Sequence, residues 1–200
     1  NFPGVWLHDR GIETLTARQL QSGLGGDSPH VVIGGPPCQA YSRSGGRSTD
    51  DPRGRLYLEY LRVVAALRPH VCVIENVPGL LDRKFGPVLE DIVARLCDLG
   101  YDHVSVLKLD AAWYGVPQLR ERLIIAANRL GLPNFYPRPL MAEDEFITAG
   151  EVLLDLARHP RDLHWNHDWT LHSRDVVAGL ARLGFGESLY DYHESWERLH

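Results

Sequence analysis

The sequence predicts an α/β fold built on a sheet whose strands run mostly parallel. Short apolar runs alternate along the chain with segments whose apolar residues follow helical spacing. Runs of the first kind are typical of buried strands, and segments of the second kind are typical of amphipathic helices. Their alternation favours βαβ units, in which ligands bind at the carboxyl ends of the strands. With 200 residues, 44% of them hydrophobic, the chain can bury the core of one domain, with or without an appendage.

The first part of the chain predicts a strand, a helix and a second strand. We expect strands over 2–8 and 31–34, because both are short apolar runs. The segment 14–24 between them has helical spacing. Its expected apolar anchors are Leu15, Leu20 and Leu24.

The middle of the chain continues the alternation. An amphipathic helix is expected over 55–68, ended by Pro69 and followed by a strand over 70–77. Another helix is expected over 87–100, where Pro87 suits the first turn. The face that the first of these helices turns to the core is expected to hold Leu56, Tyr60, Val63, Val64 and Leu67.

Two more strands are expected over 101–111 and 120–128. The approach through 110–121 is too short for a crossover helix, so the last strand is expected to run antiparallel. Beyond it, the segments 151–159 and 173–184 have helical spacing.

Composition narrows the functional classes. The formal charge of −5 gives no overall basic field, so any contact with nucleic acid must come from local clusters. The odd cysteine count and the absence of a C-x-x-C pair argue against a disulfide framework and a zinc ribbon, and favour a reducing cytoplasm. We expect Cys72 and Cys97 to be buried apolar residues. No apolar run approaches about 18 residues, and no signal peptide is recognisable. The chain opens with Asn1 rather than Met, so we expect its N-terminus to be missing.

Cys38 follows an expected strand end at a stiff corner. Pro36 and Pro37 fix the backbone before it, and Gly34 and Gly35 allow a ligand or another chain to approach closely. A thiol presented in this way is a candidate nucleophile, although a lone cysteine is more often a small buried residue.

Polar residues mark two other strand ends. Glu75 and Asn76 end the strand over 70–77, and Gln118, Arg120 and Arg122 lie where the last strand begins. Glu75 could be a structural carboxylate, and the two arginines could be solvated. Alternation places both arginines on one face, however, which favours a shared anionic or carbonyl ligand.

Three segments in order along the chain resemble the signature of the DNA (cytosine-5) methyltransferases. They are GGPPCQ (34–39), ENVPGLL (75–81) and GVPQLRERLIIAA (115–127). The resemblance covers roughly 1–127. It implies a Rossmann-like S-adenosylmethionine-dependent methyltransferase fold with a mixed, incomplete sheet and an irregular or helical C-terminal extension. The implied domains are a partial catalytic core over 1–130 and the start of the target-recognition region over 131–200.

The resemblance implies a role for each polar cluster. Cys38 would be the thiolate that adds to carbon 6 of a cytosine flipped out of double-stranded DNA, which makes carbon 5 nucleophilic. Glu75 would contact ring nitrogen 3 and the exocyclic amine, while Arg120 and Arg122 would hold the base carbonyl and a phosphate. Segment 40–55, which is rich in arginine, matches the loop after the nucleophile. Residues expected on the substrate or DNA side are Pro37, Gln39, Ser42, Arg43, Asn76 and Gln118.

The implied cofactor is S-adenosylmethionine, but its site is incomplete in this chain. The glycine-rich turn that opens family members is not found, and neither are the closing motifs. Asp9, Pro36 and Leu56 are the remaining candidates for contact with the cofactor. We therefore expect the chain alone to be inactive and to expose a sheet edge that pairs with the missing remainder of the enzyme or with a second copy.

Two other functions stay open from the residues alone. A non-catalytic interaction subunit could keep this fold, and a related enzyme could methylate RNA. The tail holds His164, His167 and His172, for which packing or contact with DNA is favoured over a metal site. We expect no membrane partner and a cytoplasmic location, associated with the nucleoid if the source is bacterial.

Overall fold

The computed structural model describes residues 4–37, 41, 51–156 and 173–182. It contains two compact units, Asn1–Val152 and Leu153–His200. The first unit holds the sheet and every cavity considered below. The described part of the second unit includes the end of α4 (Ala149–Leu156) and α5 (Arg174–Leu180). The division between a catalytic core and a target-recognition region after residue 130 stays a prediction.

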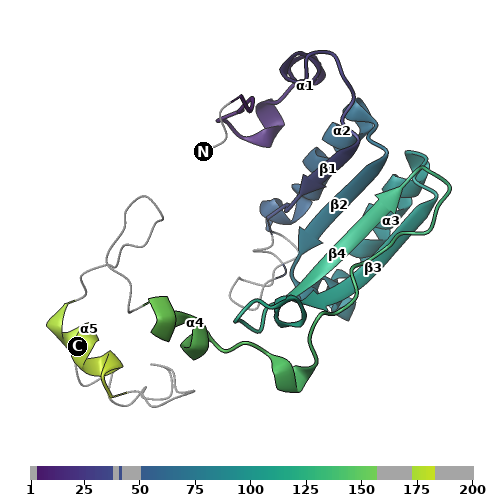
Figure 1. Cartoon of the computed structure of the whole chain (residues 1–200). Helices are drawn as coiled ribbons and strands as arrows, with labels where there is room; N and C mark the ends of the chain where they lie inside the picture. The colour runs from purple at the N-terminus through teal and green to yellow at the C-terminus, as the bar shows by residue number, and fades with distance from the viewer. Residues whose placement is uncertain (1–3, 38–40, 42–50, 157–172, 183–200) are drawn as a thin grey trace. The chain divides into compact units, whose positions relative to one another are not determined.

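A mixed four-stranded sheet forms the centre of the first unit (Figure 1). Its strands are β1 (Val31–Gly34), β2 (Val71–Asn76), β3 (His103–Asp110) and β4 (Glu121–Asn128), in the order β1-β2-β4-β3. β1 and β2 are parallel, whereas β4 is antiparallel to both β2 and β3. The prediction that the last strand runs antiparallel is confirmed, and the other strands share one direction.

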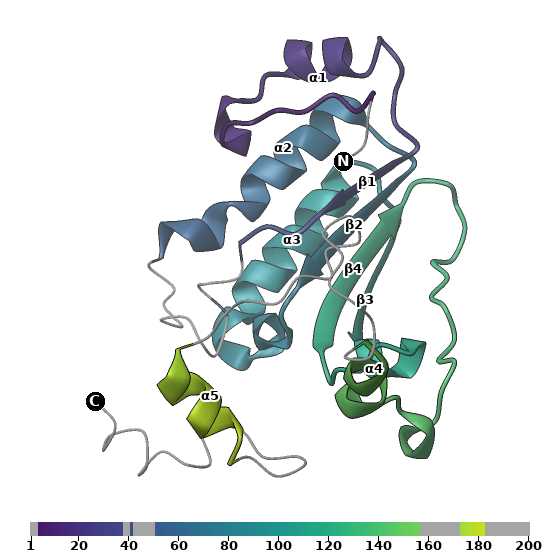
Figure 2. The ribbon, with the colours of Figure 1, turned by 60° about the vertical axis from the view of Figure 1, so that its left-hand side comes forward.

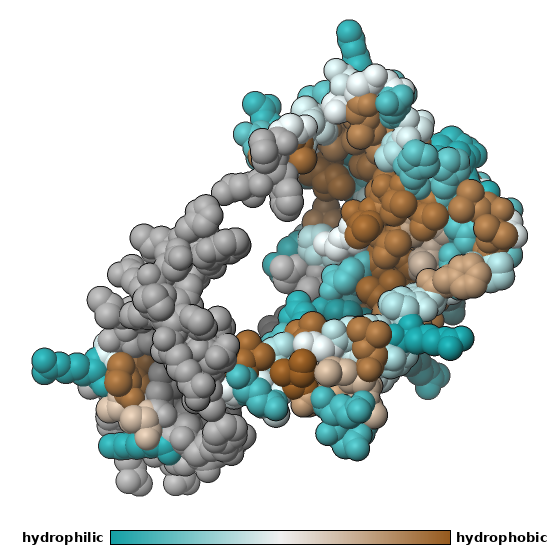
Figure 3. Space-filling model, in the orientation of Figure 1, coloured by the Kyte–Doolittle hydropathy of each residue, from teal (hydrophilic) through white to brown (hydrophobic). Residues whose placement is uncertain are grey.

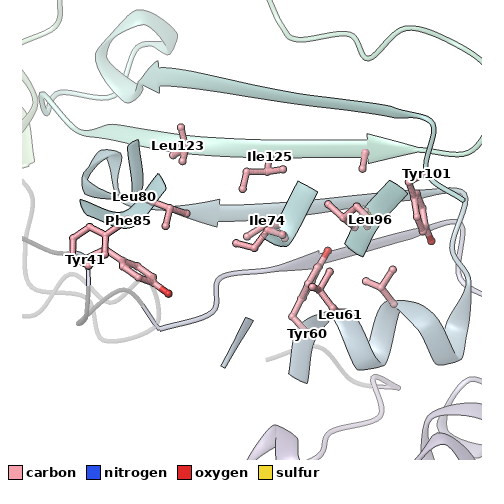
Figure 4. Packing of buried hydrophobic residues seen from close by; sticks show 14 residues of the cluster. Tyr41, Tyr60, Leu61, Ile74, Leu80, Phe85, Leu96, Tyr101, Leu123 and Ile125 are labelled. Carbon is pink, nitrogen blue, oxygen red and sulfur yellow. The ribbon is translucent and has the colours of Figure 1, made fainter. Parts of the chain in front are cut away.

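Helices α2 (Tyr57–Leu67) and α3 (Gly86–Asp98) pack on one face of this sheet (Figure 2). Alternate residues of β2 and β4 point into this layer, because successive side chains of a strand face opposite ways. Ile74 and Ile125 are both 1% exposed there and lie among Leu80, Leu96 and Tyr60 (Figure 4).

The expected cysteine burial is only half right. Cys72 is 1% exposed in β2, and burial raises the pKa of its thiol to about 12. Cys97 is exposed, so that expectation is wrong. Helix α3 turns Ile92 and Leu96 to the core, and a helical turn of 3.6 residues carries the next position away from it.

Helix α1 (Ala17–Gly23) begins with a capping box formed by Thr16 and Gln19. The segment before it is tied to α2 by Arg62, whose two terminal nitrogens donate to the carbonyls of Leu15 and Ile12, each at 2.7 Å. The expected anchors Leu15 and Leu20 are buried, but Leu24 is 37% exposed because it lies past the end of the helix.

The expected strand over 2–8 is wrong for the residues that the structure describes. Residues 4–8 form no strand, and Val5, Trp6 and Leu7 are 65%, 46% and 80% exposed. A strand needs a neighbour for its backbone hydrogen bonds, and here none of the described strands pairs with this segment. Its apolar residues therefore gave a false strand signal.

The face of the sheet opposite α2 and α3 is largely uncovered and apolar. Hydrophobic residues gather over this face in Figure 3. Val31 and Ile33 are 48% and 73% exposed, and Leu107 is 38% exposed. β1 also forms an edge, since β2 is its one partner among the described strands. Parallel strands are usually buried on both faces, so an apolar sheet face that is open to solvent is unusual.

Within the described residues, no helix combines the length and the apolar character needed to cross a membrane. The same residues contain no group of three or more metal-ligating side chains. His164, His167 and His172 lie outside the described residues.

Candidate active site

The turn after β1 is joined to the end of β2 by Asn76. This residue is 4% exposed, and its side-chain amide donates to the Pro36 carbonyl at 3.2 Å. Its side-chain oxygen accepts from the Val77 amide at 2.9 Å. Buried amides are retained where both polar ends find partners, as here. Asn76 thus holds together two of the segments that sequence analysis singled out, and Cys38 lies two residues beyond Pro36.

Glu75 and Arg122 form an ion pair between neighbouring strands. Arg122 Nε lies 2.6 Å from Glu75 Oε1, and the two side chains are 24% and 43% exposed. Gly35 packs against this carboxylate, because a Cβ built there would lie 3.2 Å from Glu75 Oε2. A side chain at position 35 would crowd the pair, so glycine permits the close approach.

An open cavity of about 740 Å³ lies beside this pair. The β2 exit turn, Val77–Gly79, forms one wall, and the β4 entrance forms the other through Gln118, Arg120 and Arg122. The two arginines that sequence analysis grouped therefore line one cavity, although Arg120 precedes the strand. Their charges are opposed by acidic residues in the same lining, namely Asp82, Asp110 and Glu121.

Sequence analysis missed Tyr41 and Gly79 as members of this cavity. The Tyr41 ring meets Phe85 edge-on, with centroids 5.1 Å apart, and its hydroxyl donates to the Gly54 carbonyl. Burial raises the pKa of Tyr41, with a further contribution from Asp51. A Cβ at Gly79 would lie 2.2 Å from the Tyr41 carbonyl oxygen, so only glycine fits. An aromatic residue within an otherwise polar stretch was the signal available in the sequence.

Several predicted site residues lie outside the described residues: Cys38, Gln39, Ser42 and Arg43. Pro37 is described and is half-buried after β1. Of the arginines in segment 40–55, Arg53 forms an ion pair with Asp51 at 2.7 Å.

The candidate cofactor residues do not gather into a site. Asp9 is exposed before α1, Leu56 is half-buried at the start of α2, and Pro36 follows β1. Other residues line the cavities of about 420, 740 and 510 Å³. Asp9, Pro36 and Leu56 therefore share none of these three cavities.

Comparisons with known proteins identify the family of this chain. The family model for C-5 cytosine-specific DNA methylase matches residues 12–198. The chain is 38% identical over 175 residues to the type II methyltransferase M.XorII of Xanthomonas oryzae pv. oryzae, covering 84% of this chain and 40% of the relative. It is 33% identical over 201 residues to M1.HphI of Haemophilus parahaemolyticus, covering 98% and 53%. The chain thus spans about half or less of the length of these relatives.

A solved structure shows the same fold. It is a protein of an E. coli prophage described as a DNA modification methyltransferase, with a TM-score of 0.56 and 26% identity. The match covers 72% of this chain and 40% of that one. Because the family model spans most of the sequence, this chain belongs to the C-5 cytosine-specific DNA methylase family.

Proposed function

We propose that the complete polypeptide carrying these 200 residues, whatever its length, transfers a methyl group from S-adenosylmethionine to carbon 5 of cytosine in double-stranded DNA. The observation that carries this proposal is the Glu75–Arg122 pair, which lies against the glycine before the Pro-Pro-Cys turn and beside the cavity. Arg120 and Arg122 line this cavity, and the Glu75 carboxylate is paired with Arg122 at its side, a polar set that suits a planar base better than an apolar ligand.

In the proposed reaction, the Cys38 thiolate forms a bond to carbon 6 of the base. The electron pair of the 5,6 double bond moves to carbon 5. Bound S-adenosylmethionine would supply the methyl group that carbon 5 takes, with cleavage of the methyl–sulfur bond and release of S-adenosylhomocysteine. A base, here taken to be solvent, removes the proton from carbon 5, and the electron pair of that C–H bond restores the double bond and expels the thiolate. A thiolate, rather than a thiol, is needed for the first step.

Glu75 is proposed to contact ring nitrogen 3 and the exocyclic amine, where it can share a proton as the ring accepts the thiolate. Arg122 orients this carboxylate through the 2.6 Å ion pair. Arg120 faces the same cavity and is proposed to hold the base carbonyl or a neighbouring phosphate. Gln118, in the same lining, is proposed to lie on the DNA side.

The proposed reaction requires base flipping, because the thiol must reach carbon 6 of the cytosine. Carbon 6 of a stacked cytosine cannot be reached by a protein thiol, so the base must leave the duplex. The open cavity between the β2 exit turn and the β4 entrance is the proposed receiving site. Asn76, being buried, is proposed to act there by shaping the turn.

The uncovered sheet face and the β1 edge are proposed to be covered in the complete polypeptide by residues outside these 200. Asp9, Pro36 and Leu56 would then contribute to S-adenosylmethionine binding together with those residues. The 200 residues alone are proposed to be inactive, and a dimer formed through the β1 edge is the alternative to be looked for. The relatives named above are type II methyltransferases, which suggests a restriction–modification role in a bacterial cytoplasm, near the nucleoid.

The test compares the complete polypeptide with its Cys38→Ser variant in methyl transfer from labelled S-adenosylmethionine to duplex DNA. Cys97→Ser is the matched control, because this thiol is exposed on α3. We expect Cys38→Ser to abolish transfer and Cys97→Ser to leave it unchanged. Equal rates for wild type and Cys38→Ser would refute the proposal, as would transfer to RNA in preference to DNA.

A further inference from the structure

We propose that Asp110 is a positioning residue that determines where Arg120 enters the cavity. The expected effect on methylation rests on the proposed function, whereas the hydrogen bonds of Asp110 do not depend on it. Asp110 is the last residue of β3, and its Oδ1 accepts from two backbone amides, those of Ala112 and Arg120, each at 3.0 Å. A carboxylate that accepts backbone N–H groups forms stronger bonds than a neutral acceptor.

Both backbone polar groups of Arg120 are fixed by consecutive residues. Its amide donates to Asp110 Oδ1, and its carbonyl accepts from the Ala111 amide at 3.1 Å. Holding the groups on both sides of one Cα fixes the direction of its Cα–Cβ bond. Asp110 therefore sets the starting point and direction of the Arg120 side chain.

Packing offers this loop little support. Asp110, Leu119 and Glu121 line the 740 Å³ cavity and also a neighbouring cavity of about 510 Å³. The β4 entrance thus borders two cavities, and Leu119, next to Arg120, is 76% exposed. A segment without close-packed neighbours depends on its hydrogen bonds for position. The bond from the Arg120 amide to Asp110 Oδ1 and the bond from the Ala111 amide to the Arg120 carbonyl are therefore the main constraints on Arg120.

The rival explanation is that the Asp110 charge acts directly in the cavity. Two substitutions separate the explanations. Asp110→Asn keeps a side-chain oxygen that can accept both amides but removes the charge, whereas Asp110→Ala removes both. Asp102→Ala is the matched control, because it removes an exposed carboxylate near the other end of β3.

The experiment measures two quantities on the complete polypeptide: amide hydrogen exchange at Ala112 and Arg120, and steady-state methylation. We expect Asp110→Ala to speed exchange at both amides by about tenfold, the scale of one lost hydrogen bond, and to lower kcat with KM for S-adenosylmethionine unchanged. We expect Asp110→Asn to keep most of the wild-type amide protection and most of the wild-type kcat. Asp102→Ala should match wild type in both quantities.

Three results would overturn the inference: unchanged exchange in Asp110→Ala, unchanged kcat in Asp110→Ala, or equal loss of kcat in the Asn and Ala variants. The last would assign the role to charge. If wild type methylates nothing, the proposed function fails, and the exchange data still decide whether Asp110 holds Arg120.

Discussion

Replacing Gly34 by alanine should destabilise the sheet, because Tyr60 occupies the space. A Cβ at Gly34 would lie 2.5 and 2.6 Å from two ring carbons of Tyr60. Carbon atoms in ordinary contact are about 3.5–4.0 Å apart, so the ring must move by about 1 Å. It cannot do so freely, since its hydroxyl bridges β1 and β2 by lying 3.0 Å from the carbonyls of both Val32 and Val73.

The expected cost has two parts. Overpacking a well-filled site costs about 1–3 kcal/mol. The hydroxyl has a single hydrogen to share between two carbonyls, so its displacement adds the net worth of one hydrogen bond, about 1 kcal/mol. Gly34→Ala should therefore lower the free energy of unfolding by about 2–4 kcal/mol.

Gly86→Ala is a control variant, for which we expect the free energy of unfolding to change in the opposite direction. Gly86 is the first residue of α3, has helical dihedral angles, and leaves open space where a Cβ would stand. Alanine there should stabilise the fold by about 0.4–1 kcal/mol, because it restricts the unfolded chain. Urea denaturation followed by circular dichroism measures both variants through the midpoint and slope.

A double-mutant cycle completes the test. Tyr60→Phe alone should cost about 1 kcal/mol, and its cost should shrink in the Gly34→Ala background, where the bridge is already lost. If Gly34→Ala is as stable as wild type while Gly86→Ala gains stability, the packing of Tyr60 against β1 is not as described and the reasoning is refuted.

Three further predictions concern the site, the thiols and the pH response. Glu75→Gln should lower the methylation rate by at least about 10²-fold with DNA affinity largely kept, and equal losses in rate and affinity would show a structural role instead. In a Cys38→Ser background, a thiol reagent should label Cys97 quickly and Cys72 only on unfolding, and rapid labelling of both would contradict the burial of Cys72. Burial raises the pKa of both Cys72 and Tyr101 to about 12, so the native state keeps protons that the unfolded state releases above pH 9 and 10, respectively. The urea midpoint should therefore fall as pH rises through this range to about 12. A midpoint that does not fall would contradict the raised pKa values of these two buried groups.

Local patterns predicted the sheet strands because each strand carries its own signal. β1, β2, β3 and β4 lie within the expected ranges 31–34, 70–77, 101–111 and 120–128, with ends shifted by at most two residues. The short approach before β4 also predicted its direction. Helical periodicity placed α2 and α3 equally well, since their apolar stripes are long.

The expected strand near the N-terminus and two contacts of the site depend on partners distant in sequence, which local patterns do not reveal. Residues 4–8 have strand-like composition, but no described strand pairs with them. Asp110 and Arg120 are ten positions apart in the sequence, and no periodicity reveals the path of the connection that brings them together. Likewise, the bond from Asn76 to Pro36 spans 40 residues and exists only once β1 and β2 pair in register.

The central claim is that Cys38 forms a covalent bond to cytosine in DNA, and trapping that bond tests it most directly. The complete polypeptide is incubated with S-adenosylmethionine and a duplex containing 5-fluorocytosine, in which fluorine blocks the final elimination. The account predicts a stable protein–DNA adduct, mapped by mass spectrometry to Cys38 and absent in Cys38→Ser. Methylation of ordinary duplex DNA without any adduct on the fluorinated duplex, or an adduct mapped to another residue, would contradict it.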